Sequence, residues 1–150
     1  NAVNRAEGCA KKIDGKDAFT IHLMLRSGKG YIATAKWRHT HYLDNADSTI
    51  DILKRVNSIL DNGLVSTSFI KKLDASLANL DILTLPEGIF NNELRRSIMN
   101  SLDDTLNDDE KEKVTDELNE LLSILNLELG YENFMNILSV LVFLNRRHEN

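Results

Sequence analysis

The chain has 150 residues, a length that suits one compact domain large enough to bury a hydrophobic core. It is 42% hydrophobic and 27% charged, and its single proline and seven glycines oppose both disorder and a β-sandwich with many turns. A single cysteine, Cys9, excludes a disulfide within the chain and is compatible with a cytoplasmic, reducing compartment.

The first residues show neither the basic segment nor the apolar run of a signal peptide, and the chain starts at Asn1 rather than at methionine. We therefore expect a processed protein or a fragment of a longer chain. The net charge of −5 is unevenly distributed, because residues 1–42 carry +5 and the remainder carries −10. This asymmetry fits either two solvated surfaces or a bipolar molecule that attracts a charged partner.

Residues 2–13 predict a short amphipathic helix, since apolar side chains recur every three or four positions until Asp14-Gly15. Residues 19–25 and 31–37 then alternate between apolar and polar side chains, which predicts a β-hairpin. Opposite side chains share a face, so Leu25 and Tyr31 lie together only if the loop has an odd length. Gly28-Lys29-Gly30 supplies a three-residue loop, with Gly30 expected at positive φ.

A two-stranded ribbon is marginally stable alone, so we expect its apolar face, Trp37 included, to be buried on the helices. One edge of the ribbon is expected to stay unpaired within the chain. Lys36 and Arg38 could protect one edge from pairing. Alternatively, the edge pairs with a second copy of the chain, which would give a homo-oligomer.

From residue 46 onward the apolar period changes to three or four, which predicts helices joined by short links. Ser48 or Asp47 is expected to cap the first of them, which Asn62-Gly63 closes. Ser66 is expected to cap the second, whose buried face reaches Leu80.

Residues 81–88 are expected to form a connector that contains the only proline. A third helix then starts near Asn91, with Leu102 and Leu106 on its apolar face. Asp108 is expected to cap a long acidic helix that ends near Gly130.

The last predicted helix, 131–147, is apolar on almost all sides but too short over 134–144 to span a bilayer. Its polar stripe, which includes Asn136 and Ser139, also carries Phe143. We expect Phe143 to be exposed and Leu144 to be buried. An exposed phenyl ring beside Arg146 and Arg147 is a combination enriched in binding surfaces.

Motifs for nucleophilic catalysis, zinc proteases and dinucleotide binding are absent, and the sequence places no base beside Cys9. His39 and His41 share one side of a strand and are the only metal candidates, but a zinc site needs three or four ligands. We expect no cofactor.

The hairpin mixes cations and aromatic side chains, a pattern that fits nucleic-acid binding. The acidic overall charge opposes that interpretation, as does the expected burial of Trp37 and Tyr31.

The sequence thus predicts an α+β, mostly α fold: a five- to six-helix bundle with one N-terminal antiparallel β-hairpin. Residues 1–45 hold the short helix and the hairpin, and residues 46–150 hold the bundle, within a single domain. The expected function is a non-catalytic protein-binding module, an adaptor, inhibitor or regulator, with another protein as partner and no membrane association. A nucleic-acid-associated regulator and an enzyme whose site is assembled from scattered residues remain alternatives. The candidate partner-binding residues are Phe143, Arg146, Arg147, Lys36, Arg38, Asp108, Asp109 and Glu112.

Overall fold

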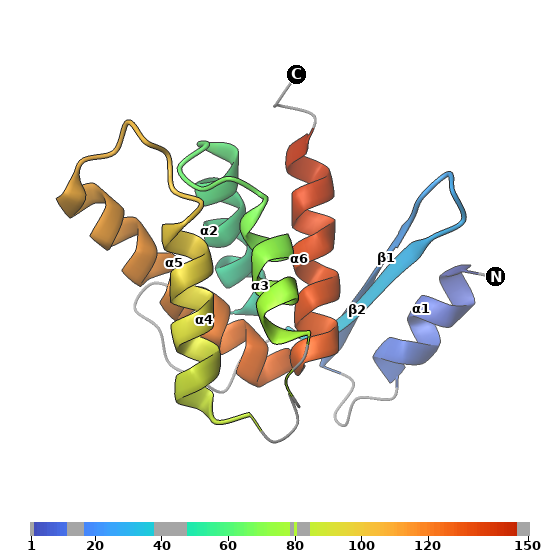
Figure 1. The fold of residues 1–150 in the computed structure, drawn as a ribbon. Coiled ribbons are helices and arrows are strands. Elements are labelled where there is room, and N and C mark those ends of the chain that lie inside the picture. The colour runs from blue at the N-terminus through green and yellow to red at the C-terminus, as the bar shows by residue number, and fades with distance from the viewer. Residues whose placement is uncertain (1, 12–16, 38–47, 79, 81–84, 147–150) are drawn as a thin grey trace.

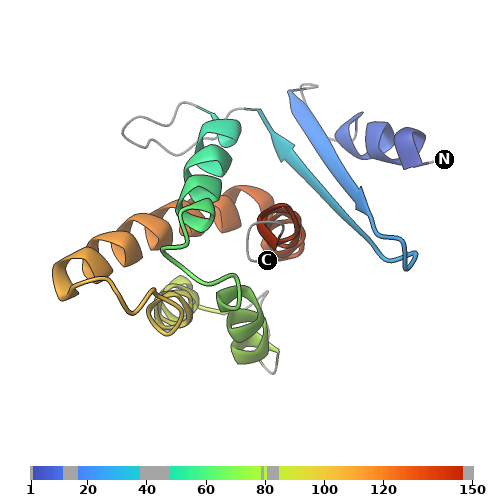
Figure 2. The same ribbon diagram turned by 90° about the horizontal axis from the view of Figure 1, so that it is seen from above.

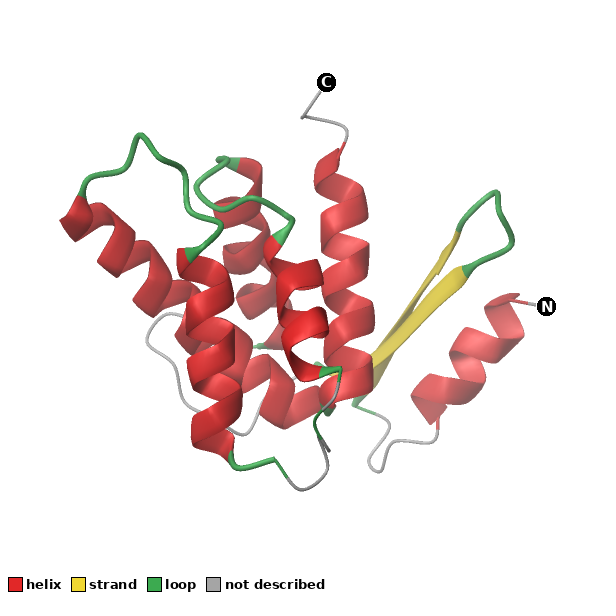
Figure 3. Ribbon diagram, in the orientation of Figure 1, coloured by secondary structure: helices red, strands yellow, loops and turns green. Residues whose placement is uncertain are grey.

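A computed structural model describes residues 2–11, 17–37, 48–78, 80 and 85–146. In chain order its elements are α1 (Ala2–Lys11), β1 (Ala18–Met24), β2 (Gly30–Lys36), α2 (Thr49–Asp61), α3 (Phe69–Leu77), α4 (Glu87–Met99), α5 (Asp108–Leu129) and α6 (Tyr131–Asn145). The α+β, mostly α fold with one N-terminal antiparallel hairpin is therefore confirmed (Figure 3).

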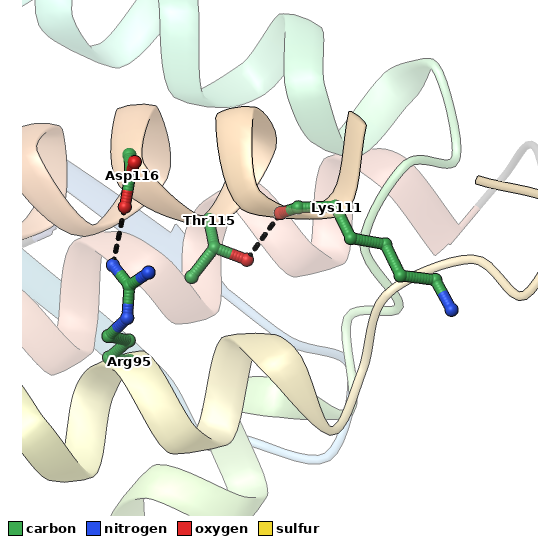
Figure 4. A network of polar contacts seen from close by, with 4 residues as sticks. All are labelled: Arg95, Lys111, Thr115 and Asp116. Carbon is green, nitrogen blue, oxygen red and sulfur yellow. Dashed lines mark hydrogen bonds and ion pairs between the residues drawn. The ribbon is translucent and has the colours of Figure 1, made fainter. Parts of the chain in front are cut away.

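The hairpin stands between α6 on one side and α1 on the other (Figures 1 and 2). Helix α6 packs against β2 and also against α2, α3 and α5, so it joins the hairpin to the other helices. Helices α4 and α5 pack together, and an ion pair between Arg95 and Asp116 connects them (Figure 4). None of the described helices is long and apolar enough to cross a membrane.

One cluster of buried apolar side chains runs through the helices and reaches the hairpin. Phe134, Ile137 and Leu138 of α6 are fully buried, as the apolar pattern of this helix predicts. Ala33 and Ala35 of β2 join the same cluster, and their small side chains allow the strand to lie close to the helices.

Three helix boundaries follow the capping pattern of the sequence. Ser48 caps α2 through its side chain, which accepts from the N–H of Asp51, and Gly63 follows the helix with φ of +70°. Helix α5 ends at Gly130 as expected, but its N-cap is Asn107 rather than Asp108. Asn107 and Glu110 form a reciprocal capping box, a stronger signal than a lone acidic residue.

The expected starts of α3 and α4 are wrong. Ser66 does not cap α3; Ser68 occupies the N-cap position and its backbone N–H donates to the hydroxyl of Ser66. Helix α4 begins at Glu87, four residues before Asn91, because Pro86 suits the entrance of a helix rather than a connector.

Four leucines differ from their expected places: Leu80 and Leu144 are exposed, whereas Leu102 and Leu106 are half-buried outside the helix, and Leu102 still packs against the core. Leu80 follows the end of α3 and is 42% exposed. Leu102 and Leu106 lie beyond the end of α4, where Leu102 pairs with Val65 in an isolated bridge. Leu144 is 54% exposed, since the far end of α6 has a neighbouring element on fewer sides.

The predicted pairing of faces is confirmed, because odd-numbered residues lie opposite odd-numbered ones, with Phe19 opposite Ala35 and Leu23 opposite Tyr31. The register differs from the one that a Gly28-Lys29-Gly30 loop would give, which places Leu25 opposite Ala33. The three-residue loop is Arg26-Ser27-Gly28 rather than Gly28-Lys29-Gly30. The N–H of Leu25 donates to the carbonyl of Lys29 and closes this loop. Gly28, not Gly30, has positive φ, at +83°. Gly30 instead leaves room for His22, whose Nε2 would lie 3.2 Å from a Cβ at that position.

Trp37 is 46% exposed, which contradicts its expected burial. It follows the end of β2, where it lies against Phe19 with the ring centroids 4.6 Å apart. That single aromatic contact covers one side of the indole and leaves the rest in solvent.

Candidate functional site

The outer edge of β2 is closed by two asparagine side chains of α6. In this hairpin the odd-numbered residues of each strand form the hydrogen-bonded pairs, as the bond from Trp37 N–H to the carbonyl of Asp17 shows. Backbone groups of even-numbered residues therefore point outward. Asn136 Nδ2 donates to the carbonyl of Ile32 at 2.8 Å, and Thr34 N–H donates to Asn133 Oδ1 at 3.2 Å.

The outer edge of β1 has no such cover. Among the residues that the structure describes, no hydrogen bond from another element reaches the backbone of Thr20 or His22. Helix α1 packs against β1, but none of its described residues forms a backbone hydrogen bond with this edge. Within the described part of the chain, the open edge is thus that of β1, where the outward donors and acceptors of Thr20 and His22 have no backbone partner.

A groove of about 700 Å³ opens between the far end of the hairpin, the start of α3 and the second half of α6. We call it the hairpin groove. Asn136 joins α6 to β2 through its bond to the carbonyl of Ile32. Toward the turn of the hairpin, the hairpin and α6 diverge (Figure 1). The lining includes Ser66–Ser68, Ile70, Lys71 and Asp74 from α3 and the residues just before it, Leu25, Lys29 and Tyr31 from the hairpin, and Met135, Asn136, Ser139, Val142, Phe143 and Arg146 from α6.

The hairpin groove has buried and half-buried apolar side chains, which we call its floor, and exposed cations, which we call its rim. Neutral polar side chains, such as Ser68, Asn136 and Ser139, also line it. Phe143 is half-buried in it, between the exposed position expected from the sequence and full burial. Three exposed cations, Lys29, Lys71 and Arg146, contribute to the lining against one carboxylate, that of Asp74.

The Asp74 carboxylate already has a partner, because the hydroxyl of Tyr131 donates to its Oδ1 at 3.1 Å. Burial of the phenol ring, followed by this hydrogen bond and the charge of Asp74, raises the pKa of Tyr131 above the ordinary tyrosine value. The phenol therefore remains a donor to Asp74 over the physiological pH range.

A second, wider groove of about 1120 Å³ lies on the opposite face of the hairpin, between α1 and the start of α6. Cys9 and His22 both line it, so the structure brings a thiol and an imidazole to one place that the sequence did not connect. No hydrogen bond joins them, and Nδ1 of His22 is buried without a partner among the described residues. A nucleophile and its base need hydrogen-bond contact, which this pair lacks in the structure.

The structure brings together only two of the predicted binding residues, Phe143 and Arg146, which line the hairpin groove. Lys36 is exposed at the other end of β2. Asp108, Asp109 and Glu112 are exposed in the first turns of α5, at the end of the molecule far from the hairpin (Figure 1). Arg38, Arg147, His39 and His41 lie outside the described residues.

Sequence reasoning missed the groove because its walls come from three segments distant in the chain. Lys29 was assigned to the turn, and no pattern in the sequence singled out Lys71. A usable signal existed in Asn133 and Asn136, since amides within an apolar helix need partners from another element.

No family model matches the chain, and comparisons with curated proteins and with solved structures find no match. Within the described residues no group of three or more His, Cys, Asp or Glu is placed to hold a metal ion.

Proposed function

We propose that this protein is a non-catalytic protein-binding module, an adaptor, inhibitor or regulator, and that the hairpin groove holds its partner. The observation that carries the proposal is the half-buried phenyl ring of Phe143 in a groove that Tyr31, Met135 and Arg146 also line. Aromatic residues, methionine and arginine are the types enriched at the centres of protein interfaces.

The arrangement of the groove also supports binding. The clamp formed by Asn133 and Asn136 fixes the hairpin on α6 before any partner arrives. A preformed surface loses less conformational freedom on association, and more of the contact energy then appears as affinity.

The test compares Phe143→Ala with Leu144→Ala, a neighbouring leucine that is 54% exposed and does not line the groove. A protein that co-purifies with the wild type is identified and titrated against both variants. We expect Phe143→Ala to weaken affinity by at least about 2 kcal/mol, roughly thirtyfold, as a central anchor does. Leu144→Ala should bind like the wild type.

Thermal unfolding of the same proteins separates binding from folding. Truncation of a fully buried phenyl ring lowers the free energy of unfolding by about 3–5 kcal/mol. Phe143 is only half-buried, so Phe143→Ala should lower it by less. Equal affinity of the wild type and a folded Phe143→Ala variant would refute the assignment of the groove.

One observation favours a second candidate, a nucleic-acid-associated regulator. Trp37 is 46% exposed beside the exposed Lys36, so a ring and a cation are available where burial was expected. The test is oligonucleotide binding followed by the fluorescence of Trp37, the only tryptophan. Salt-dependent quenching would support this function, and an unchanged spectrum at low salt would exclude Trp37 as a stacking platform.

A further inference from the structure

We infer that the hairpin groove binds an acidic amphipathic segment of a partner protein, with apolar side chains on its floor and carboxylates at its rim. This inference rests on the proposed function, because it specifies the partner of the same groove.

The charge of the rim is the first argument. Lys29, Lys71 and Arg146 form no ion pair with any described residue, although the chain as a whole carries −5. The ammonium of Lys29 lies 5.4 Å from the ring centroid of Tyr31, a cation–π contact that still leaves it able to pair with a carboxylate. Asp74, the only acidic residue of the lining, accepts from Tyr131. The groove is therefore a locally positive site on an acidic protein, complementary to carboxylates.

The floor is the second argument. Leu25, Tyr31, Met135 and Phe143 each keep part of their surface accessible within the groove, and the buried side chains of Ile70 and Val142 complete it. A purely ionic ligand would leave this apolar surface in water. A segment that also carries aliphatic or aromatic side chains would remove it from water and gain about 25 cal/mol per Å².

The size of the groove limits the occupant. A volume of about 700 Å³ falls within the range of concave sites that enclose a few side chains. It suits one short segment inserted between the hairpin and α6 rather than a broad flat interface. Peptide helices that lie in grooves use this mode, with anchors spaced along one face.

Within the described residues, no acidic segment of the chain occupies the groove. The exposed acidic residues at the start of α5 lie at the opposite end of the described structure from the hairpin (Figure 1). They do not line the groove, so they leave its cations available.

The experiment is a selection from a random-peptide display library on the wild-type protein, with counter-selection on Phe143→Ala. Synthetic versions of the enriched peptides are then measured by fluorescence anisotropy at low and at physiological salt. We expect the peptides to combine Asp or Glu with at least one large apolar residue. The double variant Lys71→Glu/Arg146→Glu should weaken their binding at least tenfold, and Lys54→Glu, an exposed cation on α2 outside the groove, should not.

The possible outcomes separate the two levels of the proposal. Enriched peptides that need Phe143 but are neutral or basic would overturn the acidic-segment inference and leave the proposed function standing. A library that yields no peptide dependent on Phe143 would overturn both. A labelled single-stranded DNA whose binding needs Lys71 and Arg146, in the absence of acidic peptide binding, would assign the groove to nucleic acid and refute the inference. Dimers that form only while the groove is intact would assign it to a second copy and refute it as well.

Discussion

The asparagine clamp allows a prediction in which two similar substitutions have different outcomes. Asn136 donates its amide hydrogen to the carbonyl of Ile32 at 2.8 Å, whereas Asn133 accepts from the N–H of Thr34 at 3.2 Å. Replacement of either amide by a carboxylate retains an acceptor and removes a donor. Asn133→Asp therefore keeps the bond to β2, and Asn136→Asp loses it.

The expected free energies follow from these contacts. In Asn136→Asp a carboxylate oxygen faces the part-buried carbonyl of Ile32, so the acceptor loses its donor and meets a negative charge. An unsatisfied buried polar group costs about 1–3 kcal/mol, and the repulsion places this variant near 3 kcal/mol. On a chain of this size that corresponds to a melting temperature lower by roughly 6–12 °C.

Asn133→Asp should change stability by less than about 1 kcal/mol, because two effects oppose each other. The variant loses the bond from Asn133 Nδ2 to the carbonyl of Leu129, which is 3.2 Å long. It gains a charged acceptor for Thr34 N–H and a negative charge in the first turn of α6, where the helix dipole favours it.

Thermal and urea unfolding of both variants at neutral pH measure this difference, and hydrogen exchange of the Thr34 amide reports the clamp itself. Protection of that amide should survive in Asn133→Asp and fall in Asn136→Asp. Equal destabilisation of the two variants would refute the assigned donor and acceptor roles. Wild-type stability of Asn136→Asp would show that the clamp does not hold β2.

Three further predictions concern the surface. Trp37→Ala should cost about half of the ~3–5 kcal/mol typical of a buried aromatic ring, and an emission spectrum like that of free indole would contradict its contact with Phe19. Reversal to lysine of three exposed acids of α5, Asp108, Asp109 and Glu112, should lower stability by only about 1 kcal/mol but slow association with a basic protein at low salt. Unchanged association rates would show that these acidic side chains interact only with water and do not attract a partner. Sedimentation should detect dimers paired through the β1 edge, and Thr20→Pro, which removes an outward donor, should abolish them. A strict monomer at high concentration would exclude this pairing.

Local pattern predicted the elements well because each depends on neighbours in the chain. The alternation of Phe19 to Leu25 and Tyr31 to Trp37 predicted which side chains share a face, since a one-residue slip would invert every side chain. The register itself depends on where the loop falls, and the loop starts two residues earlier than expected. The period also predicted the central burial of α6. Trp37 and Leu144 were misplaced because periodicity gives the side of an element but not where its neighbours end.

The site was less predictable than the fold. Helical geometry placed Phe143 on the stripe of Asn136 and Ser139, and all three do line one groove. The opposite wall, with Tyr31 and Lys29, comes from a segment about a hundred residues away in the chain. No periodicity within either segment encodes that meeting, and the amide of Asn136 is the local sign that α6 has a polar neighbour.

The same amide connects stability with binding. Asn136 lines both grooves and lies where α6 and the hairpin begin to diverge, so its bond to Ile32 fixes the width of the opening. Leu25 and Tyr31, on the hairpin side, lie beyond that bond and depend on it for their position opposite Phe143. A partner seated between the two walls would contact both and would stabilise the folded hairpin in proportion to its affinity. Asn133 and Asn136, which hold β2 on α6, therefore also organise the binding surface. Replacement of either should weaken binding, although only Asn136 lines the hairpin groove.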